Sequence, residues 1–146
     1  MKPLLLALLA GTGLLACQKE DPTTKAAVII GQPFDLALQQ TTTLPTSSAP
    51  ISLTLKTVND SRCPIGVQCL VAGYATVEVA LADATPNVQT VRISLHTNNL
   101  PNYTADSVAL TLNQRPYSLL LLDVTPYPGA ANGNETKTAR LCLRAR

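Results

Sequence analysis

Apolar and polar residues alternate along most of the chain after Pro33, which is the pattern of half-buried β-strands. In the first stretch Phe34, Leu36 and Leu38 fall on one face, and the residues between them fall on the other. The same alternation recurs in five further stretches, at 51–55, 76–81, 91–95, 108–112 and 139–143. The pattern predicts a strand in each of the six.

A seventh strand is predicted at 117–124, where four consecutive leucines at 119–122 interrupt the alternation. A central strand that is covered on both faces would account for them. Residues typical of turns and loops separate the stretches. They form a Thr/Ser/Pro connector at 41–50, a turn at Asp83–Asn87 and a hairpin connection at Asn113–Pro116.

Seven or eight short strands, with no helical period between them, predict a single all-β domain over residues 26–146. An antiparallel β-sandwich of immunoglobulin-like type fits best, because two packed sheets let each strand bury one face. A small closed β-barrel is the alternative architecture.

The N-terminus has the features of a secretory lipoprotein signal. Met1-Lys2-Pro3 carries a positive charge, and residues 4–15 form an apolar run that is too short to span a bilayer. Leu14-Leu15-Ala16-Cys17 resembles the bacterial lipobox, in which the final cysteine is lipidated. We therefore expect a signal peptide at 1–16, followed at 17–25 by the lipidated Cys17 and a flexible tether.

A lipidated Cys17 would anchor the domain on a membrane, since acyl chains contribute about 0.8 kcal/mol per buried CH2. The next four residues, Gln18-Lys19-Glu20-Asp21, resemble an export signal of lipoproteins that reach the cell surface. The expected location is the bacterial cell envelope, as an outer-membrane lipoprotein that is exposed at the surface if these residues act as the export signal and faces the periplasm if they are only a polar tether.

Composition argues against several kinds of function. The 11 basic and 9 acidic side chains nearly cancel, which argues against a nucleic-acid partner. His96 is the single histidine and no nucleophile stands in a pattern with it, so no enzyme activity is expected. Zinc needs about four ligands. The chain has one closely spaced pair of cysteines, at 63 and 69, and only Cys142 and His96 could complete a set with it. We therefore predict no metal and no cofactor.

Those two cysteines, Cys63 and Cys69, lie in the segment SRCPIGVQCLVAG at 61–73. Cys63-Pro64-Ile65-Gly66 matches a type I turn, which would bring the two cysteines within the roughly 5.5–6 Å that a disulfide needs. Disulfides persist outside the cytoplasm, and this one would stabilise the fold by about 2 kcal/mol. Cys142 is then either a half-covered free thiol or a distant partner of Cys63 or Cys69.

The segment also carries a family resemblance. Asp60-Ser61-Arg62-Cys63-Pro64, followed by Cys69 and by Ala72-Gly73, resembles a motif of small bacterial lipoproteins and secreted proteins of uncharacterised function. In those proteins DSRCP precedes a second cysteine and often the sequence WAG, where this chain has Val71 in place of tryptophan. Val124–Pro128, VTPYP, is similar to a second segment of the same proteins. The resemblance implies no activity.

Three hypotheses of function follow. The first is a non-enzymatic binding or structural accessory module of the envelope, whose loops contact an unknown envelope protein or glycan. The second is a protease inhibitor that presents Arg62, with Pro64 and Ile65 beside it, as bait on a disulfide-held loop. An enzyme of unrecognised type is the least supported, because the chain has few groups of polar residues that could act together.

Overall fold

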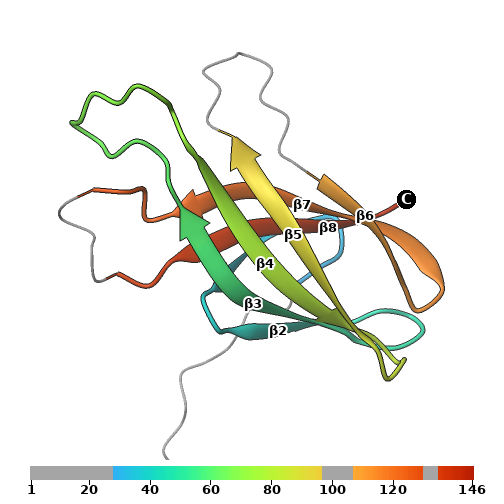
Figure 1. Cartoon of the computed structure of the whole chain (residues 1–146). Coiled ribbons are helices and arrows are strands. Elements are labelled where there is room, and N and C mark those ends of the chain that lie inside the picture. The colour runs from blue at the N-terminus through green and yellow to red at the C-terminus, as the bar shows by residue number, and fades with distance from the viewer. Residues whose placement is uncertain (1–27, 97–106, 130–134) are drawn as a thin grey trace, which may run out of the picture.

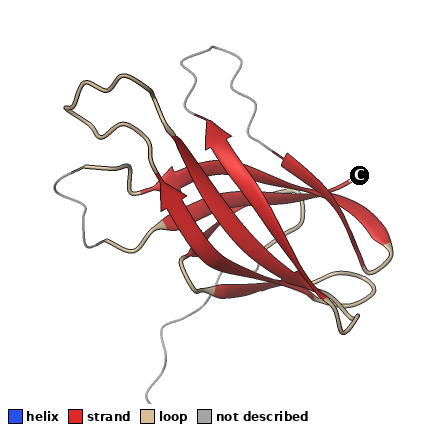
Figure 2. Ribbon diagram, in the orientation of Figure 1, coloured by secondary structure: helices blue, strands red, loops and turns tan. Residues whose placement is uncertain are grey.

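The computed structural model describes residues 28–96, 107–129 and 135–146. These residues form eight strands and no helix (Figure 2). The strands pair antiparallel throughout and build two sheets that lie face to face (Figure 1). The first sheet contains, in spatial order, β1 (Pro33–Ala37), β8 (Thr138–Ala145), β7 (Arg115–Thr125) and β6 (Ser107–Leu112). The second contains β2 (Thr41–Leu44), β3 (Ile51–Asp60), β4 (Tyr74–Ala82) and β5 (Val88–His96).

The hydrophobic core fills the space between the two sheets. Alternate residues of every strand point into it, as the period of two in the sequence requires. The fully buried side chains include Leu53, Leu55, Val77 and Val79 from the second sheet and Leu119, Leu121, Leu141 and Leu143 from the first. Each such side chain stabilises the fold by about 1.5–3 kcal/mol relative to exposure.

The predicted antiparallel sandwich is confirmed, and the two sheets do not close into a barrel. The order of the strands is sequential: β2 to β5 form one sheet, and β6 to β8 with β1 form the other. An immunoglobulin domain instead distributes its strands between the sheets in an interleaved order. Each sheet is built mainly from strands that follow one another in the chain and pair antiparallel, as consecutive strands commonly do.

One strand lies where the sequence predicts only a connector. Residues 41–44 form β2, in which Thr42 and Leu44 are buried while Thr41 and Thr43 are exposed. A tight turn with Gln39 at a φ of 64° leads into this strand. The alternation appears in burial but not in the sequence, because three consecutive threonines occupy both faces and threonine is compatible with both a strand and a loop.

The hairpin between β6 and β7 is shorter than the predicted four-residue connection. Asn113 and Gln114 form a two-residue turn, and both have a positive φ, 48° and 62°. This is the geometry of a type I′ turn, whose twist matches that of the flanking strands. Arg115 and Pro116 already belong to β7, where they pair with β6.

The four leucines of β7 are only partly explained by the sequence prediction. The strand is central in its sheet, as predicted, but its outer face is not fully covered. Leu119 and Leu121 are buried in the core, whereas Leu120 and Leu122 are half-buried. A bulge between Leu121 and Asp123 adds one residue, after which Val124 is buried again.

The chain joins the sandwich at the end opposite to the loop between β3 and β4. Gly31 donates its N–H to the carbonyl of Leu143, near the end of β8, at 2.7 Å. From there β1 runs toward the start of β8, where Ala37 pairs with Thr138. The β3–β4 loop lies beside that start and projects beyond the sheets in Figure 1.

The predicted signal peptide at 1–16, Cys17 and the tether at 17–25 lie outside the described residues and stay predictions. Within the described ranges, the chain forms no helix that is long and apolar enough to cross a membrane.

Candidate functional site

The loop that joins β3 to β4, residues 61–73 and hereafter loop 61–73, is held by its own backbone and by a disulfide. Ser61 donates its N–H to the carbonyl of Tyr74, and Cys63 donates to the carbonyl of Ala72, both at 2.9 Å. A disulfide joins Cys63 to Cys69 across a Cα–Cα distance of 5.9 Å. The disulfide predicted from the sequence is therefore confirmed.

The turn inside the disulfide lies one residue later than predicted. Val67 donates its N–H to the carbonyl of Pro64 at 3.2 Å, so the turn covers Pro64–Val67 rather than Cys63–Gly66. Gly66 is the third residue of this turn and has a φ of 82°, the position and conformation that define a type II turn. Glycine fits there because it has no Cβ to oppose a positive φ.

Arg62 lies beneath the loop and is not presented on its surface, in contrast to the expectation for a protease bait. Its side chain is 2% exposed and that of Asp60 is 3% exposed. Nε and Nη2 of Arg62 donate to Oδ1 and Oδ2 of Asp60, both at 2.7 Å, in a bidentate pair. Nη2 also donates to the carbonyl of Val124 at 2.5 Å. The arginine thus connects the start of the loop to the end of β7.

Two further charges, on the partly exposed Asp123 and Lys137, extend the buried pair into a network that we call the charge cluster: Asp60, Arg62, Asp123 and Lys137. Nζ of Lys137 donates to Oδ2 of Asp60 at 2.9 Å and to the carbonyl of Pro126 at 2.5 Å. Asp123 places Oδ1 3.7 Å from Nη1 of Arg62. The charge cluster contains two positive and two negative groups, so its charges balance.

Tyr127 adds an aromatic contact to the charge cluster. The guanidinium carbon of Arg62 lies 4.2 Å from the centroid of the Tyr127 ring, within the range of a cation–π interaction. Ile65 donates its N–H to the carbonyl of Pro128 at 3.1 Å, which brings the same segment against the loop itself. The segment after β7 therefore supports loop 61–73 from below.

The charge cluster favours the charged forms of Asp60 and Arg62. Burial disfavours the charged form of Asp60, but hydrogen bonds and charges from Arg62 and Lys137 outweigh it, and the pKa of Asp60 lies below its ordinary value. Burial likewise disfavours charge on Arg62, but the hydrogen bond and charge of Asp60 hold its pKa above the ordinary value. The salt bridge is therefore intact at neutral pH.

The outer part of the loop is apolar and faces solvent. Ile65 and Val71 are each 75% exposed, and Val67 and Leu70 are also exposed. We call these four side chains the apolar tip. Of the seven exposed large hydrophobic residues among the described residues, four form the apolar tip and a fifth, Tyr74, follows directly after it. Pro64 is half-buried at the base of the turn.

The sequence prediction identified the loop, but it missed most of the exposed apolar residues and the buried ion pair beneath them. Pro64 and Ile65 were named as contact residues, whereas Val67, Leu70 and Val71 were not. Their signal was a run of large apolar residues inside a short cysteine loop without strand alternation. Asp60 and Arg62 lie two apart in extended chain and so share a side, which is a signal for their pairing. Nothing local indicated Lys137.

The remaining predicted groups do not join the site. Cys142 is a free thiol and is fully buried in β8, rather than half-covered or disulfide-bonded. His96 is the last residue of β5, and its side chain lies outside what the structure describes. Within the described part of the chain, no three His, Cys, Asp or Glu side chains converge in a way that could hold a metal ion.

Comparison of this chain with protein-family models, with curated proteins and with solved structures found no match.

Proposed function

We propose that this protein is a lipid-anchored, non-enzymatic binding module of the bacterial envelope that docks a partner protein on the apolar tip of loop 61–73. The single observation that carries the proposal is the exposure of Ile65, Val67, Leu70 and Val71 together on one fixed loop. Exposed apolar patches mark interaction sites on proteins.

The support beneath the tip favours binding over a merely hydrophobic loop. The Cys63–Cys69 disulfide and the charge cluster hold the backbone in one conformation before any partner arrives. A loop that is already ordered loses less conformational entropy on binding. Apolar side chains at its centre can then enter pockets on the partner and exclude water, as the main contributors to interface energy do.

The place where the chain joins the sandwich favours a protein over the anchoring membrane as the occupant. Gly31 lies at one end of the sandwich, beside Leu143, and loop 61–73 lies at the other. If Cys17 is lipidated, the tether enters at the end away from the apolar tip. The tip then points away from the lipid and toward other molecules of the envelope.

The structural roles of the DSRCP residues support the proposed family resemblance. Three residues of the DSRCP motif have a structural role, since Asp60 and Arg62 form the buried pair and Cys63 forms the disulfide. We propose that this chain belongs with the lipoproteins that share the motif, and that the motif specifies the base of a loop whose tip varies.

The protease-inhibitor alternative finds no support in the position of Arg62. To enter a protease pocket, this side chain would have to leave Asp60, Val124 and the ring of Tyr127. Inhibition of a trypsin-like protease by the purified chain, lost in Arg62→Ala, would restore that alternative over the one proposed.

Site-specific photo-crosslinking in the producing cells tests the proposed docking. A photoreactive amino acid is placed at Leu70, in the apolar tip, and separately at Val88, which is 62% exposed at the opposite end of the sandwich. We expect a defined protein adduct from Leu70 and none from Val88. The adduct should weaken when Ile65 and Val67 are both replaced by serine, and strengthen in Val71→Trp.

Three results would overturn the docking proposal. The first is an absence of any protein adduct at Leu70 beyond that at Val88. The second is an adduct with lipid alone, which would make the tip a membrane contact. The third is an adduct with a second copy of this chain, which would make loop 61–73 an interface of a homo-oligomer.

The lipid anchor is tested separately. Cells that express the protein are given an alkyne analogue of palmitate, and the label on the protein is measured. We expect label on the wild type and none on Cys17→Ser, with Cys142→Ser as the matched cysteine control. Equal labelling of Cys17→Ser would refute the anchor.

A further inference from the structure

The outer face of the second sheet carries a hollow of about 500 Å³, well away from the core. Three strands line it in matched register. Thr57 of β3, Glu78 of β4 and Arg92 of β5 form one row across the sheet. Because alternate residues share a face, the next row outward lies two positions along each strand.

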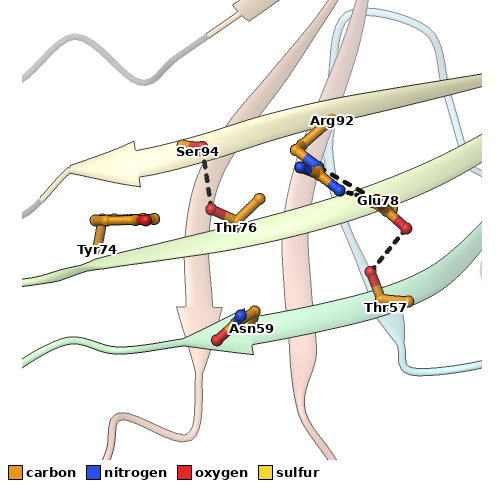
Figure 3. A pocket seen from close by; sticks show the side chains of 7 residues that line it. All are labelled: Thr57, Asn59, Tyr74, Thr76, Glu78, Arg92 and Ser94. Carbon is orange, nitrogen blue, oxygen red and sulfur yellow. Dashed lines mark hydrogen bonds and ion pairs between the residues drawn. The ribbon is translucent and has the colours of Figure 1, made fainter.

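That second row consists of Asn59, Thr76 and Ser94, and Tyr74 lies beyond it (Figure 3). Figure 3 shows Tyr74 at one end of the hollow and the pair of Glu78 and Arg92 toward the other. The hollow therefore has a ring at one end, charges at the other and hydroxyl and amide groups between them.

A β-bulge contributes to the shape of this face. The register of β3 against β4 shifts between Leu55 and Thr57. Residues 51, 53 and 55 point into the core before the shift, and Thr57 and Asn59 are turned to the outer face after it. Bulges bend the strand that carries them and increase its twist, which is the way a flat sheet face becomes concave.

The charges in the hollow neutralise each other. Nε and Nη2 of Arg92 donate to Oε1 of Glu78, at 3.2 and 2.5 Å, and Thr57 donates its hydroxyl to Oε2 at 3.1 Å. The hydrogen bonds from Arg92 and then Thr57 hold the pKa of Glu78 below its ordinary value. A charged ligand would therefore have to compete with an existing ion pair, whereas a neutral ligand would not.

The hollow still has hydrogen-bonding capacity. The side-chain amide of Asn59 is exposed and makes no hydrogen bond with any residue in the described ranges. It offers two donors and one acceptor. The hydroxyls of Thr76 and Ser94 lie 3.1 Å apart, where either can donate, and their one hydrogen bond leaves one proton and three lone pairs of the two groups available.

Tyr74 supplies the apolar component. It is 50% exposed and lies at the end of the hollow next to loop 61–73. An aromatic ring presents a flat face with a negative charge distribution, against which polarised C–H groups can lie. The combination of one such ring with closely spaced hydroxyl and amide groups matches the two surfaces of a sugar ring, one of C–H groups and one of hydroxyls.

We propose that this hollow binds a neutral saccharide, which rests on Tyr74 and forms hydrogen bonds with Asn59, Thr76 and Ser94. Glu78 and Arg92 mark the end of the site, where the carboxylate accepts from a sugar hydroxyl and the guanidinium donates to one without breaking their ion pair. All the groups stand on paired strands, and Thr57, Glu78, Arg92, Thr76 and Ser94 are also linked across them by side-chain hydrogen bonds, so little conformational entropy is lost on binding.

Nuclear magnetic resonance titration tests the saccharide site. The 15N-labelled full chain is kept in a detergent whose headgroup is not a sugar, and maltose, cellobiose, lactose and chitobiose are added in separate series. We expect at least one of these to shift the backbone signals of Thr57, Asn59, Thr76 and Ser94 in a saturable way. Asn59→Ala and Tyr74→Ala should each weaken that binding about tenfold, which corresponds to about 1.4 kcal/mol.

Two controls give the titration its specificity. Thr54→Ala alters the outer face of β3 outside the hollow, where Thr54 bonds to Thr41, and should leave the binding unchanged. Leu70→Ser alters the apolar tip and should also leave it unchanged, so failure of the docking proposal and failure of this one are distinguishable. Sodium phosphate and sodium sulfate serve as charged probes.

The saccharide proposal is overturned by any of three results: no saturable shift with the four disaccharides, shifts of these residues by the anions alone, or equal affinity in wild type, Asn59→Ala and Tyr74→Ala.

Discussion

The two connections of β4 show how differently one sheet can join its strands. The β4–β5 turn, Asp83–Asn87, is closed by one carboxylate: Oδ1 of Asp83 accepts from the backbone N–H and the hydroxyl of Thr85, at 2.8 and 2.6 Å. Its Oδ2 accepts from the N–H of Asn113, at 2.6 Å. Loop 61–73 at the other end is held by a disulfide and by the four residues of the charge cluster, and it exposes the apolar tip.

The difference indicates what a hairpin requires and what it does not. A turn of five residues with a local Asp–Thr hydrogen bond joins antiparallel strands of the same sheet. Loop 61–73 is longer, carries buried charges whose desolvation is unfavourable, and leaves large hydrophobic groups in water. None of these features is needed to connect β3 to β4, which is why we propose a binding role for the loop and not for the turn.

Removal of the central carboxylate of the charge cluster should have the largest effect. Asp60→Ala leaves Arg62 and Lys137 beneath the loop without their main partner, and we expect a loss of about 3 kcal/mol in the free energy of unfolding. Denaturant unfolding measures it. Asp83→Ala is the matched control in the exposed turn, and an equal loss in both variants would remove the distinction between the two regions.

Replacing Gly73 by alanine should cause the next largest loss of stability. Gly73 has a φ of 71°, and a Cβ there would lie 2.0 Å from the carbonyl oxygen of Ser61. We expect Gly73→Ala to destabilise the fold by about 2–3 kcal/mol. Gly66→Ala has a similar φ but meets nothing within 4 Å, so about 1–2 kcal/mol is expected. Thermal unfolding compares them, and a larger loss at Gly66 would contradict the close approach.

Loss of the disulfide should have a moderate effect on stability and a larger one on the tip. Replacing Cys63 and Cys69 together by serine reopens a short loop, which corresponds to about 2 kcal/mol. Hydrogen exchange should rise in residues 64–71 and stay unchanged in 83–87. Unchanged exchange in the loop would show that the charge cluster alone holds it.

The smallest expected effect is on how the free energy of unfolding changes with pH in the acid range. The pKa of Asp60 is lowered in the folded chain, so its contribution is complete above the ordinary carboxyl value near 3.8 and is lost as the pH falls through that value and the folded pKa. Asp60→Asn should therefore flatten the fall of unfolding free energy in acid. Hydrogen bonds from Thr85 and Asn113 also lower the pKa of Asp83, but that group is exposed, and Asp83→Asn should flatten the curve less. The opposite ranking would place the acid-sensitive contact in the turn.

Sequence reasoning succeeded where the signal was local. The disulfide followed from two cysteines that flank Pro64 and Gly66, and the sandwich followed from apolar alternation. The position of the turn was wrong by one residue because proline and glycine fit two adjacent turn types, and only the φ of Gly66 distinguishes them. The sequence could not show that Asn59, Thr76 and Ser94 lie side by side in the hollow, because the register of the strands was unknown.

The sequence by itself determined the period of the strands and the cysteine pair, because each depends on neighbours within a few residues. Only the tertiary structure decided that Arg62 is buried and that the apolar tip is exposed. Lys137 is 77 positions from Asp60, and Val124 is 62 positions from Arg62. Whether a side chain is buried depends on residues that the fold brings to it from such distances. Arg62, which the sequence placed on an exposed loop, therefore lies buried at the base of that loop.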